Sequence, residues 1–402
     1  MREKAIQILA LPSEGLALFR RGLGLLCILD ACLRLPSAVF WLTDLGVLPR
    51  SLYFRLFEDT LNWSVYSISG RPEFVVCLLL ATAILGAVQV AGRSKRWIRV
   101  ALWVLLLSVQ NRNPGVTDAA DHLLRLLLFW DMLLPETPAE PRDYLSPATV
   151  GLQLQLSVAA GALAWHVSER GWQQAAAWSL SERAFAIPWL WMAVKLFLLI
   201  VTVGIWVRPL RIVPLLCGVP VLFSWGAIWD PFLPLTLLVA GSVCYRSRRD
   251  FGAVVESGRG LAAGAVVAGI LILGQFVPSL SEEARFSSGG LGLEQSWESS
   301  YPGEETAVVA LLARRLVGGD VLWNLDFTSD RRSRMWAQKV GQDRQWASRL
   351  TDALQHRLEL SEMPVVWMKK SSVQADQTLG PVELELLTDT PVWGETRGRV
   401  EL

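Results

Sequence analysis

Charged residues are scarce in this chain of 402 residues: they make up 19% of it, whereas apolar residues make up 52%. Soluble domains contain about 25% charged and about 45–50% apolar residues. The shortage of charge is concentrated in residues 1–280, which hold nearly all the long uncharged runs, and it excludes a purely cytosolic enzyme, a disordered regulator and a disulfide scaffold. The composition is typical of a polytopic membrane protein with a polar tail.

Motifs for common chemistries are missing as well. The chain has only three histidines, which argues against a histidine-rich haem or di-metal centre. It has no GxSxG, P-loop or HExxH sequence. Its five cysteines lie in apolar stretches with no CxxC or Cys/His spacing, which argues against zinc. No Lys/Arg-rich block is large enough to suggest binding of nucleic acid.

Net charge divides the chain in two. Residues 281–402 contain 14 Lys+Arg and 19 Asp+Glu, a net charge of −5. Subtraction from the 38 basic and 37 acidic residues of the whole chain leaves 24 and 18 for residues 1–280, a net charge of +6. We therefore predict a basic membrane domain over residues 1–283, a linker rich in Gly and Ser over 284–304, and an acidic domain over 305–402.

Nine segments are long and apolar enough for membrane-spanning helices, which need about 20 mostly apolar residues. They are residues 15–36, 74–92, 97–112, 120–134, 144–168, 184–207, 212–229, 231–245 and 260–281. In the tail, apolar runs at 306–317, 321–327, 363–369 and 381–387 predict strands, although the first run also fits a helix, and 331–358 predicts an amphipathic helix. The predicted fold class is an all-α polytopic membrane bundle of about nine transmembrane helices, followed by a small α+β extracytoplasmic domain.

The orientation of the bundle is predicted from Lys and Arg in the short loops. With nine spans, four basic clusters fall on the same side: Arg2 and Lys4; Arg93, Lys95, Arg96 and Arg99; Arg208 and Arg211; and Arg246, Arg248 and Arg249. The positive-inside rule then places the N-terminus in the cytoplasm and the C-terminal domain outside.

Ionisable residues inside the predicted spans form two sets. Asp30 and Arg34 are four residues apart and share a helix face, and Arg20 lies near that face about three turns earlier. Asp121 and Arg125 have the same spacing in the fourth span, near Asp118, His122 and Asp131. Such charges cost about 2.5–3.5 kcal/mol each on insertion scales, so they persist when paired or functional. Two interpretations stay open: a lock between spans one and four, or a buried polar site that opens to the outside.

Lys195 is a lone basic residue near the middle of the sixth span. It either pairs with a carboxylate of another helix, such as Asp230 or Asp131, or acts as a base of depressed pKa.

Two stretches resemble a known family. The first is FRRGLGLLCILDACLRLP with FWLTDLGVLPRS, at 19–36 and 40–51, and the second is LLLSVQNRNPGVTDAADHLLRLLLFWDMLLP at 105–135. Together with GLEQSWESSYP at 292–302, they are similar to the HTTM family, the membrane domain of the vitamin K-dependent gamma-carboxylase and its bacterial relatives. The resemblance implies about nine helices in a bacterial inner (plasma) membrane, with the site on the outer face. The candidates for a ligand pocket or structural ion pairs are Arg20, Asp30, Arg34, Asn111, Asn113, Asp121 and Arg125.

The resemblance also implies a chemistry for which this chain lacks two of the expected residues. In carboxylase members a deprotonated lysine starts the oxygenation of reduced vitamin K, and the resulting strong base deprotonates a glutamate γ-carbon to which carbon dioxide adds. That lysine is expected five residues before Trp172, where this chain has Val167. His166 and Lys195 remain as candidate bases, but a histidine of pKa about 6.5 is weaker than an amine of pKa about 10.4. The family's histidine near span seven is also missing from VLFSWGAIWDP at 221–231.

We therefore expect a non-carboxylating HTTM-type integral membrane protein that binds lipid or quinone, or is an accessory subunit of a membrane complex. The expected partners are membrane lipid and other membrane or extracytoplasmic subunits, contacted through residues 284–402. No nucleic acid and no metal are expected. The alternative is a divergent vitamin K-dependent gamma-carboxylase or quinol epoxidase.

Overall fold

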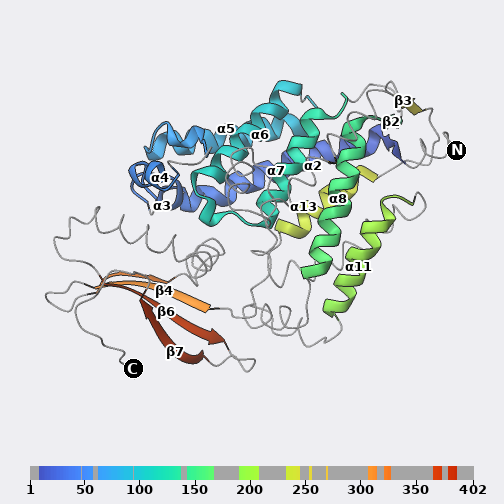
Figure 1. Ribbon diagram of the computed structural model, residues 1–402. Coiled ribbons are helices and arrows are strands. Elements are labelled where there is room, and N and C mark those ends of the chain that lie inside the picture. Colours follow the sequence, from blue (N-terminus) through green and yellow to red (C-terminus); the bar gives the residue numbers. More distant parts are fainter. Residues whose placement is uncertain are drawn as a thin grey trace.

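The fold is built mainly from helices and includes one four-stranded sheet (Figure 1). The computed structural model describes residues 9–46, 48–57, 62–93, 95–136, 143–166, 190–207, 232–244, 253–255, 269, 307–314, 321–326, 365–373 and 379–386. The predicted spans 212–229 and 260–281, Gly269 apart, lie outside these residues, as do the linker and the predicted helix at 331–358.

Three helices in the described part of the chain are long and apolar enough to cross a membrane: Ser13–Leu42, Pro72–Val90 and Pro147–Trp165. The first combines α2 (Ser13–Arg34), η1 (Leu35–Ser37) and α3 (Ala38–Leu42), and the others correspond to α5 (Pro72–Val90) and α8 (Pro147–His166). Pro36 lies at the 3₁₀ turn, where it lacks the N–H that a continuing α-helix would use. These apolar helices are compatible with a membrane protein.

Four more helices lie in predicted spans: α6 (Arg96–Arg112), α7 (Ala119–Leu133), α11 (Leu190–Gly204) and α13 (Phe232–Gly241). Shorter elements connect them: α4 (Arg50–Leu56), η2 (Val65–Ser67), η3 (Pro114–Val116) and η5 (Ser242–Cys244). Helix formation within these four predicted spans is confirmed.

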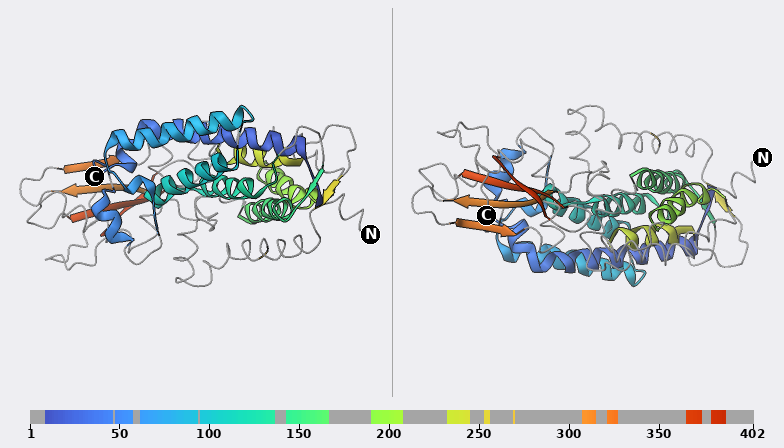
Figure 2. Two further views of the ribbon diagram at one scale, coloured as in Figure 1. Left: turned by 90° about the horizontal axis from the view of Figure 1, so that it is seen from above. Right: turned by 90° about the horizontal axis from the view of Figure 1, so that it is seen from below.

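Helices α2 and α5 pack closely against each other. Both views in Figure 2 show these two helices side by side along one edge of the bundle. Their backbones meet at two glycines: a Cβ atom built on Gly24 would lie 2.6 Å from the Gly86 carbonyl oxygen, and one built on Gly86 would lie 2.7 Å from the Gly24 oxygen. Small residues at both positions are therefore required for this approach.

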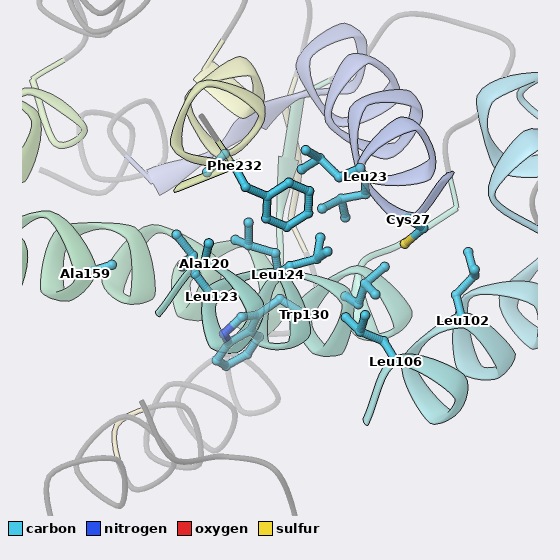
Figure 3. Close-up of a cluster of buried hydrophobic side chains, with 14 of the residues drawn as sticks. Leu23, Cys27, Leu102, Leu106, Ala120, Leu123, Leu124, Trp130, Ala159 and Phe232 are labelled. Atoms are coloured by element: carbon cyan, nitrogen blue, oxygen red, sulfur yellow. The ribbon is translucent and has the colours of Figure 1, made fainter. Parts of the chain in front are cut away.

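A buried apolar core fills the middle of the bundle between α2, α7 and α13. Leu23 and Cys27 of α2 lie close to Leu124 of α7 and Phe232 of α13 (Figure 3). The four side chains are buried, as the apolar face of each helix requires.

Two small sheets accompany the helices. β1 (Leu11–Pro12) pairs antiparallel with β2 (Asp143–Leu145), which pairs in parallel with β3 (Ala253–Val255). The second sheet contains β4 (Ala307–Arg314), β5 (Val321–Asp326), β6 (Val365–Val373) and β7 (Leu379–Leu386) in the order β5-β4-β6-β7, and all neighbours are antiparallel. All four strands lie within or overlap the apolar runs predicted from the sequence, and the run that also fitted a helix forms β4.

Candidate functional site

Arg34, near the C-terminal end of α2, lies between two carboxylates. Its side chain is only 1% exposed. Nε donates to both oxygens of Asp30 at 2.8 Å, and Nη2 donates to Asp121 Oδ1 at 2.6 Å. The predicted Asp30–Arg34 pair is confirmed, and the same guanidinium also joins α2 to α7. We call Asp30, Arg34 and Asp121 the Arg34 cluster.

Asp121 has a second role at the start of α7. Asp118 is the N-cap residue: its Oδ1 accepts the backbone N–H of Asp121 at 2.7 Å, while Asp121 Oδ2 accepts the N–H of Asp118 at 3.3 Å. This capping box satisfies two N–H groups that the helix itself cannot pair. One carboxylate therefore both starts the helix and ties it to α2.

The QNRNP segment at the end of α6 holds several chain segments together. Four consecutive side chains each donate to a backbone carbonyl of another segment. Gln110 donates to Asp121 at 2.8 Å, Asn111 to Trp63 at 3.1 Å, Arg112 to Leu48 at 2.6 Å, and Asn113 to Trp41 at 3.1 Å. The candidate residues Asn111 and Asn113 are thus buried and fix the loops on this end of the bundle.

Arg125 follows Asp121 by one helical turn of α7. Its Nη1 donates to Gln110 Oε1 at 3.1 Å, so the amide of Gln110 bonds α7 through both of its polar atoms. Arg125 therefore bonds α7 to α6.

Arg20, two turns into α2, forms a second buried group with Asp131 of α7. Arg20 Nε donates to Asp131 Oδ1 at 2.9 Å, and Gln89 of α5 donates to Asp131 Oδ2 at 3.1 Å. Arg99 of α6 donates to the backbone oxygen of Asp131 at 2.8 Å. We call Arg20, Gln89, Arg99 and Asp131 the Arg20 cluster, and it joins four helices.

Both arginines of this cluster also cover the C-terminal carbonyl groups of α7. Arg20 Nη2 donates to the oxygen of Pro135 at 2.7 Å, and Arg99 Nη1 lies 3.3 Å from that of Leu134. Cations are stabilising at a helix C-terminus, where the dipole is negative. The charged clusters therefore complement both ends of α7.

The two clusters lie at opposite ends of the α2–α7 contact. Arg20 and Arg34 are fourteen positions apart on α2, which corresponds to about 21 Å along the helix axis. Leu23, Cys27 and Leu124 fill the space between them with apolar side chains (Figure 3). Polar contacts thus fix both ends of an otherwise apolar interface.

A partly exposed ion pair anchors the loop after α3. Asp44 accepts hydrogen bonds from the backbone N–H and from Nε of Arg50, both at 2.8 Å, and Arg112 Nη2 lies 3.8 Å from Asp44 Oδ1. Partial burial raises the pKa of the Asp44 carboxyl, but the hydrogen bonds and charge of Arg50, with the charge of Arg112, outweigh it and hold the pKa below its usual value. Burial raises the pKa of the Tyr53 hydroxyl. The Cζ atom of Arg112 lies over the Tyr53 ring, 5.4 Å from its centroid.

The arrangement leaves the main carboxylates of the bundle occupied by arginine and amide donors. In the described part of the chain, no three His, Cys, Asp or Glu residues are grouped so as to hold a metal ion. The direct effect of this geometry is that opposite charges on neighbouring helices neutralise each other.

The candidate bases come from two other helices, α8 and α11. His166 is the last residue of α8, and Lys195 is a partly exposed residue of α11. Asp131, one suggested partner of Lys195, accepts from Arg20 and Gln89, while Asp230, the other, lies outside the described residues, as does Val167.

Sequence reasoning missed Gln89 and treated Arg99 only as a topology signal. Gln89 could have been found, because it is a lone amide near the end of an otherwise apolar run, residues 74–92. Comparisons with models of protein families, with curated proteins and with solved structures found no match.

Proposed function

We propose that the chain is a non-carboxylating integral membrane protein of HTTM type that binds a lipid or a quinone of the membrane. The observation that supports the non-carboxylating part of this proposal is that the charged residues of spans one and four pair with one another. Arg34 binds Asp30 and Asp121, while Arg20 binds Asp131, so these groups act as a lock between helices. The QNRNP side chains are likewise engaged with backbone carbonyls.

A carboxylase would need a strong base beside its quinol. Val167 stands where the resemblance expects the lysine, and the histidine expected near span seven is absent. Lys195 is on α11, within an apolar helix. The absence of both expected groups supports a binding role over turnover.

The activity test supplies purified protein with reduced vitamin K, labelled bicarbonate and a glutamate-rich peptide. We expect neither labelled peptide nor vitamin K epoxide. Turnover that disappears in His166→Ala or Lys195→Ala would restore the divergent carboxylase or quinol epoxidase. Mass spectrometry of solvent extracts from protein purified in mild detergent then identifies the ligand, and we expect a quinone or lipid retained at a fixed ratio to protein.

An accessory role in a membrane complex is the second candidate. The net charge of −5 over residues 281–402 favours it, because an acidic tail can recognise a basic partner surface. Crosslinking in intact membranes, compared between the full chain and a chain ending at residue 283, tests it. Crosslinks that persist unchanged without the tail would exclude the tail as the partner surface.

We also propose that the N-terminus is cytoplasmic and the C-terminal residues are extracytoplasmic in a bacterial inner membrane. The basic clusters of the short loops support this orientation. An alkaline phosphatase joined after Leu402 should be active. An inactive phosphatase there, together with an active cytoplasmic reporter at the same position, would contradict the nine-span topology.

A further inference from the structure

Positive charge gathers where the turn between α5 and α6 meets α2. Gly92 adopts φ +73° in this turn, and its N–H donates to the Gln89 carbonyl at 3.0 Å, which ends α5. A Cβ atom built on Gly92 would lie 3.8 Å from Arg21 Nη2, so α2 brings a further cation against the turn. The exposed cations here are Arg21, Arg93, Lys95 and Arg96, which we call the basic corner.

Two further arginines lie buried beneath the basic corner. Arg20 and Arg99 share one buried carboxylate, that of Asp131. Arg99 is 1% exposed, and its Nε and Nη2 have no hydrogen-bond acceptor in the described part of the chain. Glu136 lies 3.9 Å from Arg99 Nη2, but that glutamate is 71% exposed.

Among the residues that the structure describes, these six cations therefore lie near few acids. Besides Asp131 and Glu136, the acid in the first turn of α2 is Glu14, about two turns before Arg20. Arg99 lies within electrostatic range of both Arg20 and Arg96. Such crowding of like charge is unfavourable unless an anion lies nearby.

The helices that leave the basic corner carry exposed apolar side chains. Leu25 follows Arg21 by one turn of α2 and is 51% exposed, and Val100 follows Arg96 by one turn of α6 and is 40% exposed. Trp97, next to Arg96, is 61% exposed. Tryptophan is common at membrane interfaces, where its ring lies at the level of the lipid headgroups. Charge at the corner and apolar side chains beside it together match an amphipathic anion.

We propose that the basic corner binds the phosphate of an anionic phospholipid whose acyl chains lie along the exposed side chains of α2 and α6. A free phosphate ion would use the charges but not the apolar side chains, so the surface is assigned to the lipid. The proposal requires α2, α5 and α6 to lie in a membrane and does not depend on whether the chain has catalytic activity or binds a quinone.

The test measures the affinity of phosphatidylglycerol and phosphatidylcholine for the full chain in detergent, by native mass spectrometry. Each Lys or Arg near an anionic lipid surface contributes about fivefold in affinity. The variant Arg21→Gln/Arg93→Gln/Arg96→Gln should therefore bind phosphatidylglycerol about 100-fold more weakly if the contributions add. The matched variant with Lys at the same three positions should keep most of the affinity, because the charge is retained.

Arg71→Gln removes an exposed cation at the other end of α5 and serves as the control. It should bind phosphatidylglycerol as the unchanged chain does. Equal affinity for the two lipids, an unchanged affinity in the triple Gln variant, or an equal loss in Arg71→Gln and Arg93→Gln would each overturn the proposal. Displacement of the lipid by millimolar inorganic phosphate would show that the acyl chains contribute nothing, and would also overturn it. Unfolding temperatures without lipid verify that all variants are folded.

Discussion

Arg34 Nη2 and Asp121 Oδ1 lie 2.6 Å apart, although 87 positions separate the two residues in the sequence. Arg34 also holds Asp30, so one guanidinium neutralises two buried carboxylates. Removal of Arg34 and removal of one of its two carboxylates should therefore destabilise the protein by unequal amounts.

Arg34→Met should destabilise the protein more than Asp121→Asn. The first variant leaves two buried carboxylates without their cation, and breaking a buried pair costs about 3–5 kcal/mol. The second leaves Arg34 paired with Asp30 and should cost about 1–3 kcal/mol. Thermal unfolding in detergent measures both effects. Arg50→Met, which removes a partly exposed pair with Asp44, is the control and should cost about 1 kcal/mol or less. Equal effects of Arg34→Met and Asp121→Asn would contradict the shared role of Arg34.

Arg20→Lys should destabilise the bundle although it keeps the charge. Arg20 binds Asp131 through Nε and the Pro135 oxygen through Nη2, and one ammonium group cannot span both acceptors. The expected cost is about 1–3 kcal/mol in unfolding measurements. Arg21→Lys, at the neighbouring exposed position, should leave the unfolding temperature unchanged. A stable Arg20→Lys protein would show that only the charge is needed.

Gly24→Ala and Gly86→Ala should each weaken the contact between α2 and α5. The added methyl group would lie within 2.7 Å of a backbone oxygen, which cannot move without separating the helices. Overpacking of this kind costs about 1–3 kcal/mol. Gly161→Ala in α8 is the matched control: its nearest neighbour, Thr202, would be 3.7 Å away. That variant should be neutral or slightly stabilising, because alanine favours helices over glycine by about 1 kcal/mol.

The loop that Asp44 anchors should loosen in acid. Since the folded pKa of Asp44 lies below its usual value, the ionised carboxylate stabilises the loop above the unfolded pKa of about 3.9. This contribution is lost as the pH falls through the lowered folded pKa. Pulsed hydrogen exchange of α4 should therefore show less protection below about pH 3 than at pH 6. In Asp44→Asn the pH-dependent part should vanish, and a profile identical to that of the unchanged chain would contradict the assignment.

Sequence spacing correctly predicted the features that depend only on residues close together in the chain. The Asp30–Arg34 contact follows from a separation of four residues on one helix, and the helices at predicted spans such as 74–92 follow from length and hydropathy. The strands β4 to β7 likewise follow from apolar runs.

A lock between spans one and four was one of the two interpretations drawn from the sequence, but the individual partners across it were beyond that reasoning. Nothing in the spacing of Asp121 and Arg125 shows that Arg34 would bind the first or that Gln110 would bind the second. Both contacts depend on the antiparallel alignment of α2 with α7 and on the entry of α6 beside them. The small β1-β2-β3 sheet was also missed, because its strands have only two or three residues and come from segments far apart in the sequence.

The positions of the ion-pair partners along the sequence have a consequence for the insertion of α2 into the membrane during synthesis. α2 emerges from the ribosome with Arg20, Asp30 and Arg34, but the carboxylates of Asp121 and Asp131 follow about a hundred positions later. If α2 entered the lipid alone, Asp30 and Arg34 could still pair with each other, but Arg20 would lack the carboxylate of Asp131 and would oppose insertion by about 2.5–3.5 kcal/mol. Stable integration of the first helix should therefore wait for translation of the fourth, and a nascent chain truncated before Asp121 should leave α2 extractable by alkali.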